Sequence, residues 1–327
     1  MQKALLILIL IVGFGIIGFG QESDSTKSYR HEIQIVSDND NYLLNLEDGY
    51  YTNGLFISYS FINYDRNKAK IINGKKTKAI TRFELGQLIY NPHDYDSYAN
   101  GNVDRPFAGY LYVKAQQSRF YENENLLRYG ISVGVIGQSS FARQIQTVYH
   151  HFLGIHHLEG WQTQVNNTAT VNLNFDYVYH LLGKSPRRFF DIAAIGKINA
   201  GNAFDNAIGS LVLRLGKFEK NDRSAYWNSR LDKSSGKYAK KSELFIFIQP
   251  ELEYQFYNAT LEGGMFLKEK GPVTSPPMPW VYTNHIGFCY AKNKIGLSFA
   301  YVHESREAKT MIANDDYATL SFSLRFN

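Results

Sequence analysis

A cluster of hard oxygen donors lies near the start of the chain, in the stretch SDNDNYLLNLEDGYYTNG from Ser37 to Gly54. Its side-chain oxygens come from Asp38, Asn39, Asp40, Asp48 and Thr52. Carboxylate, amide and hydroxyl oxygens suit Ca2+ or Mg2+ better than zinc or copper. The spacing is not that of an EF-hand loop, because Gly49 stands where that loop needs a glutamate. The stretch therefore indicates a hard-cation site, or else a polar turn, since Asp, Asn and Gly also build turns.

A helical period appears further along, in SSFARQIQTVYHHFL at residues 139–153. The apolar positions three or four apart are Phe141, Ile145, Val148 and Phe152. A second stripe at the same spacing is polar and consists of Arg143, Gln146 and His150. Ser139 or Ser140 can cap the start of a helix, and Gly154 can end it. We therefore expect one amphipathic helix, with the last two polar residues one turn apart.

His150 is the candidate general base. Imidazole titrates near neutral pH and is the usual side chain that activates water. A Ca2+ ion beside it would act as a Lewis acid and stabilise an oxyanion, so the two together would suffice to hydrolyse an ester. The alternative is a hydrogen-bonded surface histidine. The nearby His151, His156 and His157 could bind a soft metal, but no regular ligand spacing supports zinc.

Alternation of apolar and polar residues recurs from end to end and is the signal of strands. The expected strands are 31–36, 55–61, 83–89, 111–115, 127–135, 171–179, 189–199, 208–218, 244–256, 282–290, 295–303 and 318–326. These are about 12 strands, an even number as in single-chain outer-membrane barrels. The long connections are 65–78, 91–104, 139–166, 219–242 and 268–279. We expect long loops at one end of the barrel and short turns at the other.

The fold class that these strands predict is all-β, a transmembrane antiparallel β-barrel with a short helix in an extracellular loop. Mean hydropathy is −0.32, yet aromatic residues make up 15% of the chain. A barrel escapes hydropathy analysis because each strand is apolar only on its lipid side. A soluble β-sandwich or lipocalin-like barrel would also alternate. The last strand, which closes with Phe326 one residue from the end, favours the membrane barrel.

Export is indicated by the N-terminus, where a basic Lys3 precedes a short apolar run and small residues. We expect a signal peptide at residues 1–20 and a single barrel domain at residues 21–327 in the outer membrane of a Gram-negative cell. Cys289 is the only cysteine, so no internal disulfide is possible. The net charge of +5 is mild and scattered, which gives no nucleic-acid footprint. We expect a monomer.

Several motifs occur in a recognisable order between Ile35 and Gln164. They are the ND pair at 39–40, DGYYTNG at 48–54, GQLIYNP at 86–92, DRPFAGYLY at 104–112, GVIGQSS at 134–140, QTVYHHFLG at 146–154 and GWQTQ at 160–164. In order and spacing they resemble the outer-membrane lipid A 3'-O-deacylase family. Beyond Gln164 the resemblance rests on the barrel pattern alone.

The resemblance implies a 12-stranded barrel whose active site, contributed by residues 35–164, lies at the outer rim between the wall and a loop helix. It implies a Ca2+-dependent carboxylic ester hydrolase that removes an acyl or acyloxyacyl chain from the 3' position of lipid A in lipopolysaccharide. Carried over by motif, Asn39, Asp40 and Thr52 would organise the Ca2+ ion and the carbonyl, and His150 would be the base. Asp38 and His151 add a second candidate at each position.

Four further residues are candidates for substrate binding. Arg105 could bind a phosphate through two hydrogen bonds or pair with Asp104 at the surface. Trp161 could contact substrate, or anchor the chain at the membrane interface, or pack in the interior. Gln146 and Gln164 could orient His150 or satisfy the backbone of the loop.

Two other functions remain open from the sequence. An outer-membrane phospholipase of the serine type would need a serine beside a histidine, and Ser139 and Ser140 are the nearest. A porin or adhesin barrel would use the same loops for binding and would hydrolyse nothing.

Overall fold

The computed structural model describes residues 28–43, 49–63, 70–71, 74–93, 103–154, 159–182, 189–232 and 242–327. The expected signal peptide, Asp48, His156 and His157 lie outside these ranges. The strands are β1 His31–Asn39, β2 Tyr51–Ile62, β3 Lys70–Ile71, β4 Gly74–Tyr90, β5 Ala108–Tyr121, β6 Leu126–Ile136, β7 Thr168–His180, β8 Phe190–Gly201, β9 Phe204–Lys217, β10 Glu243–Asn258, β11 Trp280–Lys292, β12 Ile295–Glu304 and β13 Asp315–Phe326. The helices are α3 Ala142–Leu153 and α4 Ala259–Glu262, with short 3-10 turns η1 Asp40–Leu43, η2 Gln138–Ser140, η3 Trp161–Thr163 and η4 Ala225–Trp227.

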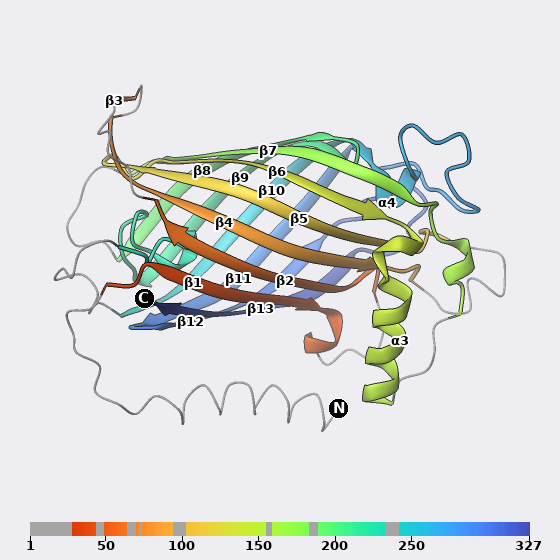
Figure 1. The fold of residues 1–327 in the computed structure, drawn as a ribbon, viewed down its shortest axis with the longest axis horizontal. Helices are drawn as coiled ribbons and strands as arrows, with labels where there is room; N and C mark the ends of the chain where they lie inside the picture. Colours follow the sequence, from red (N-terminus) through yellow and green to blue (C-terminus); the bar gives the residue numbers. More distant parts are fainter. Residues whose placement is uncertain are drawn as a thin grey trace.

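Twelve of these strands form a closed antiparallel barrel (Figure 1). Each strand pairs with its neighbours in sequence, and β1 closes the ring by pairing with β13 in register from His31 and Phe326 to Asn39 and Ala318. β3 is a two-residue strand that pairs only with β4 and is not part of the ring. Closure satisfies the backbone hydrogen bonds of every wall strand, which a structure in lipid requires. The prediction of 12 wall strands is confirmed.

The outer surface of the wall is apolar, because alternate residues of each strand point outward. Exposed large side chains recur at every second position on neighbouring strands, as in β1 and β2 with Ile33, Ile35, Leu55, Ile57 and Tyr59, and in β7 with Val171, Leu173 and Phe175. The residues between them point into the lumen and include the buried polar side chains of Ser58, Ser60, Asn172, Arg214 and Arg325. This distribution is that of a barrel whose outside contacts lipid. Among the described residues no helix is long and apolar enough to cross a membrane.

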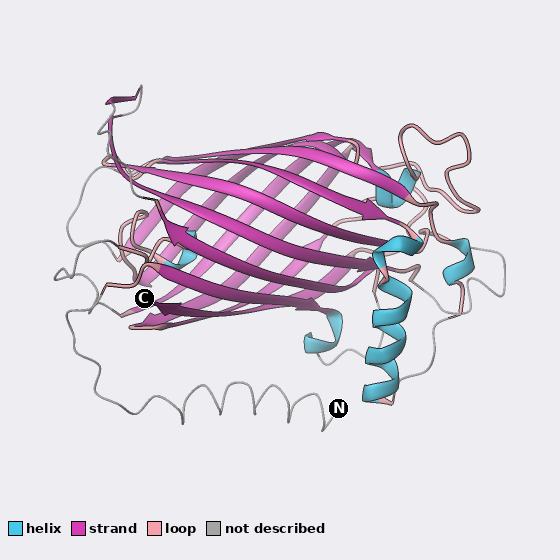
Figure 2. Cartoon of the chain, in the orientation of Figure 1, coloured by secondary structure: helices cyan, strands magenta, loops and turns pink. Residues whose placement is uncertain are grey.

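The two ends of the barrel differ in what covers them (Figure 2). The end opposite the start of β1 and the C-terminus carries η1, α3, η3 and α4 and the described residues of the connections 91–107, 137–167 and 259–279. We assign this end to the cell exterior, since the longer loops of such barrels face outward. The expected segregation of loop lengths is wrong in one respect, because the long connection between β9 and β10 has its described residues 218–232 at the end where β1 begins. Segment 65–78 is also shorter than expected as a loop, because β4 already begins at Gly74.

The segment that follows β9 folds back into the lumen at the end where β1 begins and the C-terminus lies. Trp227 and Leu231 are buried there among inward-facing residues of the wall, namely Ile62, Ile80, Phe120, Leu126, Val178, Ala193, Ile195 and Val212. The segment is also held by polar contacts, since the Lys78 ammonium donates to the Leu231 carbonyl at 2.7 Å and the Arg128 guanidinium donates to the Trp227 carbonyl at 3.1 Å. This lumen plug, residues 218–232, closes the barrel below the rim that carries α3.

Candidate active site

The oxygen-donor cluster is divided by the wall of the barrel. Ile33 and Ile35 of β1 are exposed on the outer surface, so Asn39, at the same parity, ends the strand on the outer face. Asp38 has the opposite parity and lines a cavity in the lumen, where its carboxylate accepts a hydrogen bond from the Tyr51 hydroxyl at 2.9 Å. The side chains of Asp38 and Asn39, although adjacent in sequence, therefore lie on opposite faces of the wall.

Asn39, Asp40 and Thr52 come together at the rim. The Asn39 amide donates to the Thr52 carbonyl at 2.9 Å, which ties η1 to the start of β2. The Asn41 backbone N–H donates to Asn39 Oδ1 at 3.0 Å and to Asp40 Oδ1 at 2.7 Å, and the Gly49 N–H donates to Asp40 Oδ2 at 2.7 Å. Asn39, Asp40 and Thr52 are each nearly fully buried. Part of the cluster thus shapes a turn, as the simpler interpretation of the sequence predicted.

A β-bulge places the Thr52 side chain. Tyr51 pairs with Tyr90 and Asn53 pairs with Ile89, so the register of β2 and β4 leaves Thr52 as an extra residue. Bulges of this kind change the direction of a side chain and are frequent beside active sites. Thr52 Oγ1 lies 3.5 Å from the Ile89 carbonyl and 3.5 Å from Asn91 Nδ2.

Asn91 is a site residue that sequence reasoning missed. It follows the end of β4, is 1% exposed, and its Oδ1 atom has no hydrogen-bond partner. The Asn91 N–H donates to the Tyr50 carbonyl at 2.9 Å, so the residue is held beside the bulge. Its signals in the sequence were its place in the GQLIYNP motif at 86–92 and its position before Pro92, which any strand end can have.

Helix α3 turns its polar side toward the barrel. Ala142, Gln146 and His150 are buried, whereas Phe141, Ile145 and Val148 are exposed, Val148 to 70%. The sequence predicted both stripes and the end of the helix at Gly154, whose positive φ of 73° makes the C-cap. Phe141 and not a serine occupies the N-cap position, with φ of 60° and no cap from its own side chain, but Ser140 Oγ accepts a hydrogen bond from the Ala142 N–H at 3.4 Å.

The first turn of α3 rests on the outer face of β4 and β5. Gly109 in β5 permits the approach, since a Cβ atom there would lie 2.1 Å from Ser140 Oγ and 2.2 Å from Ala142 Cβ. The Gln87 amide of β4 donates to the Ser140 carbonyl at 2.6 Å. Ala142 also packs with Ile89, Phe107 and Trp161 in one buried cluster. Because Thr52 Oγ1 contacts the Ile89 carbonyl, the helix and the bulge meet at the same strand end.

His150 and His151 are distinguished by their surroundings. His150 is 2% exposed on the face of α3 that carries Gln146, whereas His151 is exposed. Gln146 is itself fixed, since its Oε1 accepts a hydrogen bond from the Trp161 indole at 2.9 Å. The polar stripe that faces the wall is therefore Gln146 and His150, while Arg143 of the predicted stripe is exposed.

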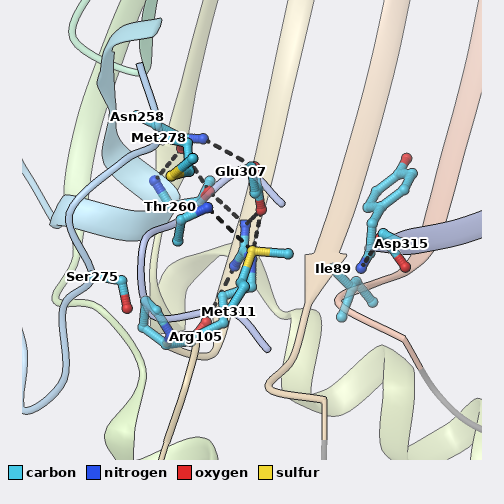
Figure 3. Close-up of polar contacts among 12 residues, drawn as sticks. Ile89, Arg105, Asn258, Thr260, Ser275, Met278, Glu307, Met311 and Asp315 are labelled. Atoms are coloured by element: carbon cyan, nitrogen blue, oxygen red, sulfur yellow. Dashed lines mark hydrogen bonds and ion pairs between the residues drawn. The ribbon is translucent and has the colours of Figure 1, made fainter. Parts of the chain in front are cut away.

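Arg105 is not a surface residue, contrary to both alternatives from the sequence. Its guanidinium is fully buried under the rim, where it forms an ion pair with Glu307, donates to Thr260 Oγ1 at 3.0 Å and lies 4.1 Å from the centre of the Tyr90 ring (Figure 3). Its burial leaves no exposed guanidinium for a phosphate at the surface. Arg105 connects the segment before β5 to the loop before β13 and so stabilises the rim.

Asp104 has other partners than Arg105. The Tyr50 hydroxyl donates to Asp104 Oδ2, and the His93 N–H donates to Asp104 Oδ1 at 3.2 Å. Burial, followed by the hydrogen bond to the Asp104 carboxylate, raises the pKa of the Tyr50 hydroxyl. Tyr50 therefore remains a neutral donor at the rim.

Among the remaining candidates, the buried ones contact other residues of the rim. Trp161 is 2% exposed and packs against Phe107 at 5.1 Å between ring centres, so it is a packing residue and not an interface anchor. Gln164 is buried in the same loop. Ser140 is fully buried and donates to the Gly137 carbonyl at 2.6 Å, which leaves it unsuited to act as a nucleophile. Ser139 is exposed.

The donors at the bulge fit a Ca2+ ion by their chemistry. They comprise one carboxylate, two amides and a hydroxyl, from Asp40, Asn39, Asn91 and Thr52, and hard cations favour such oxygens. Each oxygen that already accepts one hydrogen bond keeps a second lone pair, and Asn91 Oδ1 has no partner at all. No group of three His, Cys, Asp or Glu side chains that could hold a metal occurs within the described ranges.

The fold and the rim define an outer-membrane β-barrel with a helix packed on the outside of its wall. A family model described as outer membrane protein LpxR matches residues 5–326. The chain belongs to this family and is an outer-membrane protein.

Several solved structures are similar to the chain. LpxR from Salmonella typhimurium is similar with 20% sequence identity and a TM-score of 0.70, over 90% of this chain and 100% of that one. The translocator domain of autotransporter NalP from Neisseria meningitidis has 8% identity and a TM-score of 0.44, over 99% and 98% of the two chains. The β domain of the Bordetella autotransporter BrkA has 8% identity and a TM-score of 0.43, over 92% and 99%. No curated protein matches the chain in sequence.

Proposed function

We propose that this protein is a Ca2+-dependent lipid A 3'-O-deacylase of the outer membrane. The observation that carries the proposal is the orientation of α3. Its buried side holds Ala142, Gln146 and His150, and Ala142 packs on Ile89, whose carbonyl Thr52 contacts. Membership in the LpxR family and the resemblance of the motifs support the same activity. A site on the outside of the wall is open to lipids of the outer leaflet, which suits a lipid substrate.

His150 is the general base in this proposal. Its imidazole accepts a proton from a water molecule, the water oxygen attacks the acyl carbonyl carbon, and the bond to the sugar oxygen breaks. The imidazolium then returns the proton to the departing sugar oxygen, so the products are a free fatty acid and a 3'-hydroxyl on lipid A. Gln146, held by Trp161, limits where the substrate and His150 can meet.

Asn39, Asp40, Thr52 and Asn91 would hold the Ca2+ ion. When bound, Ca2+ supplies positive charge that stabilises an oxyanion. Asp40 also holds the turn at Gly49, so its replacement should disturb both the turn and the cation.

The test is mass spectrometry of lipid A from a Gram-negative strain without a deacylase that expresses the chain, with and without a Ca2+ chelator. Loss of the 3'-linked chain is expected with the wild type and with His151→Ala, whose histidine is exposed and serves as the control. His150→Ala should reduce the rate by about 100-fold or more, as removal of a general base does, and the chelator should stop the reaction.

Three results would contradict the proposal. Full activity of His150→Ala rules out this base, and activity that the chelator leaves unchanged rules out the cation. Unchanged lipid A together with hydrolysed phospholipid would assign the site to a different lipid.

A further inference from the structure

The lumen beneath the outer rim contains a cavity of about 300 Å³ that is separate from the candidate active site. Its lining includes the carboxylates of Asp38, Glu253 and Glu304 and the rings of Tyr51, Tyr90 and Tyr317. Asn39 and α3 lie on the other side of the wall, so the cavity plays no part in the proposed hydrolysis. Glu307 and Asn258 also line the cavity and belong to the rim, which places it directly below the extracellular end.

These three carboxylates have neutral partners. Asp38 accepts from the Tyr51 hydroxyl at 2.9 Å, Glu253 from the Asn206 amide at 2.7 Å, and Glu304 from the Thr283 hydroxyl at 3.3 Å. In the part of the chain that the structure describes, none of the three forms an ion pair with Lys, Arg or His. Glu307, in contrast, is neutralised by Arg105.

Asp38 adds independent evidence that a partner is missing. It is 8% exposed, and its Oδ1 atom has no hydrogen-bond partner. Buried charges are normally paired, because an isolated carboxylate loses its hydration without compensation. Asp38 lines the same cavity as Glu253 and Glu304, so positively charged groups in the cavity would compensate these carboxylates.

The size and the rings of the cavity favour an organic cation. A water molecule takes up about 30 Å³, so the volume exceeds what a metal ion with direct ligands needs, and no three acidic side chains converge on a metal position within the described ranges. Tyrosine rings attract ammonium groups and pack against methylene groups. The ring centres of Tyr51 and Tyr317 lie 4.9 Å apart in a T-shaped arrangement, and those of Tyr51 and Tyr90 lie 5.2 Å apart. The three rings therefore form one aromatic cluster.

We propose that this cavity is a binding site for a soluble alkyl diamine or polyamine, with its ammonium groups on the carboxylates and its methylene chain on the tyrosine rings. A soluble amine is favoured over an amine-bearing lipid headgroup, because the wall separates the cavity from the bilayer. The inference stands whether or not the chain is a deacylase.

The experiment is isothermal titration calorimetry of the full chain in detergent micelles with putrescine. Saturable binding with a stoichiometry of one is expected, whereas butane-1,4-diol, which has the same chain length and no charge, should not bind. Glu253→Gln and Glu304→Gln should each weaken putrescine binding by about tenfold or more, since each removes a charge-assisted contact. Glu159→Gln, which removes an exposed carboxylate outside the barrel, should change nothing.

The proposal is overturned if putrescine does not bind, which would mean that protons neutralise the carboxylates. It is also overturned if the diol binds as well as putrescine, or if Mg2+ binds and putrescine does not displace it. Titration with phosphatidylethanolamine nanodiscs distinguishes a lipid headgroup from a soluble amine. Binding of this lipid without binding of putrescine would assign the site to the headgroup. If a glutamine variant does not fold, the comparison of putrescine with the diol on the wild type decides the question.

Discussion

Single residues at this rim differ in role even where their side chains are similar. Asn39 and Asp38 are adjacent, yet the alternation of β1 sends one to the outer site and the other to the lumen. His150 and His151 are adjacent as well, and the turn of α3 buries one and exposes the other. The chemistry of a residue here depends on the face it occupies.

Arg105 is expected to stabilise the rim and not to bind substrate. Arg105→Met should lower the free energy of unfolding by about 3 kcal/mol, because it leaves the Glu307 carboxylate, whose side chain is 12% exposed, without its ion-pair partner. Urea unfolding in detergent measures this effect. The double variant Arg105→Met, Glu307→Leu should recover part of the lost stability. If Arg105→Met instead unfolds like the wild type but binds lipid A more weakly, Arg105 binds phosphate as the sequence suggested.

Helix α3 is positioned by the wall and not by its own caps. Its first turn lies on Gly109, Gln87 supports the Ser140 carbonyl, and Trp161 holds Gln146. A helix with a buried polar side and an exposed apolar side is the reverse of the usual arrangement on a soluble protein. On the outside of a membrane barrel it is favourable, because the exposed side meets lipid.

Gly109 gives a direct test of the position of the helix. Gly109→Val should displace the start of α3 and reduce deacylation by about 100-fold, as displacement of a catalytic group by about 1 Å does. The barrel should still fold, which heat-modifiable migration on a gel can show. Gly209→Val is the matched control, since a Cβ atom at that wall position has nothing within 4 Å; equal activity of the two variants would disprove the packing argument.

The apolar side of α3 is expected to hold the site against the membrane. Val148→Asp should reduce deacylation of lipid A in vesicles by about tenfold, because it removes a contact comparable to the burial of one aliphatic side chain. Activity on a short-chain ester in detergent should be unchanged. Thr147→Asp adds the same charge at the preceding exposed position, and equal losses in both variants would point to charge and not to lost lipid contact.

At the scale of the whole molecule, the barrel combines an apolar outside with a lumen that is closed near the termini. The lumen plug packs Trp227 and Leu231 into the wall and is tied to it through Lys78 and Arg128. The Arg214 guanidinium adds to this connection, since it pairs with Asp191 and donates to Ser224 Oγ at 3.1 Å. We therefore expect that the barrel does not form an open channel.

Conductance across planar bilayers tests this conclusion. The wild type should show no stable open channel, and a variant in which a short Gly-Ser linker replaces residues 220–230 should conduct. Phe266→Ser, a change at an exposed position of the opposite end, should remain closed. Open channels in the wild type would instead favour the porin interpretation.

The amino-acid sequence by itself determined the strands, their number, the helical segment and the end of that helix at Gly154. These features are local, because strand alternation and helical period depend on residues a few positions apart. The alternation of β1 also implied that Asp38 and Asn39 point to opposite faces of the wall, although the sequence pattern grouped them in one cluster of oxygen donors. Thr52 and His150 were named as candidates from motifs, and the roles assigned to them remain predictions.

Only the tertiary structure decided which side of α3 faces the wall, that Arg105 is buried against Glu307, and that the segment after β9 enters the lumen. Each of these depends on contacts between residues far apart in sequence, such as Arg105 and Glu307. Such contacts exist only once β1 has closed on β13. The reason is physical, since closure of the ring decides which faces meet lipid, water or protein, and no local pattern contains that information.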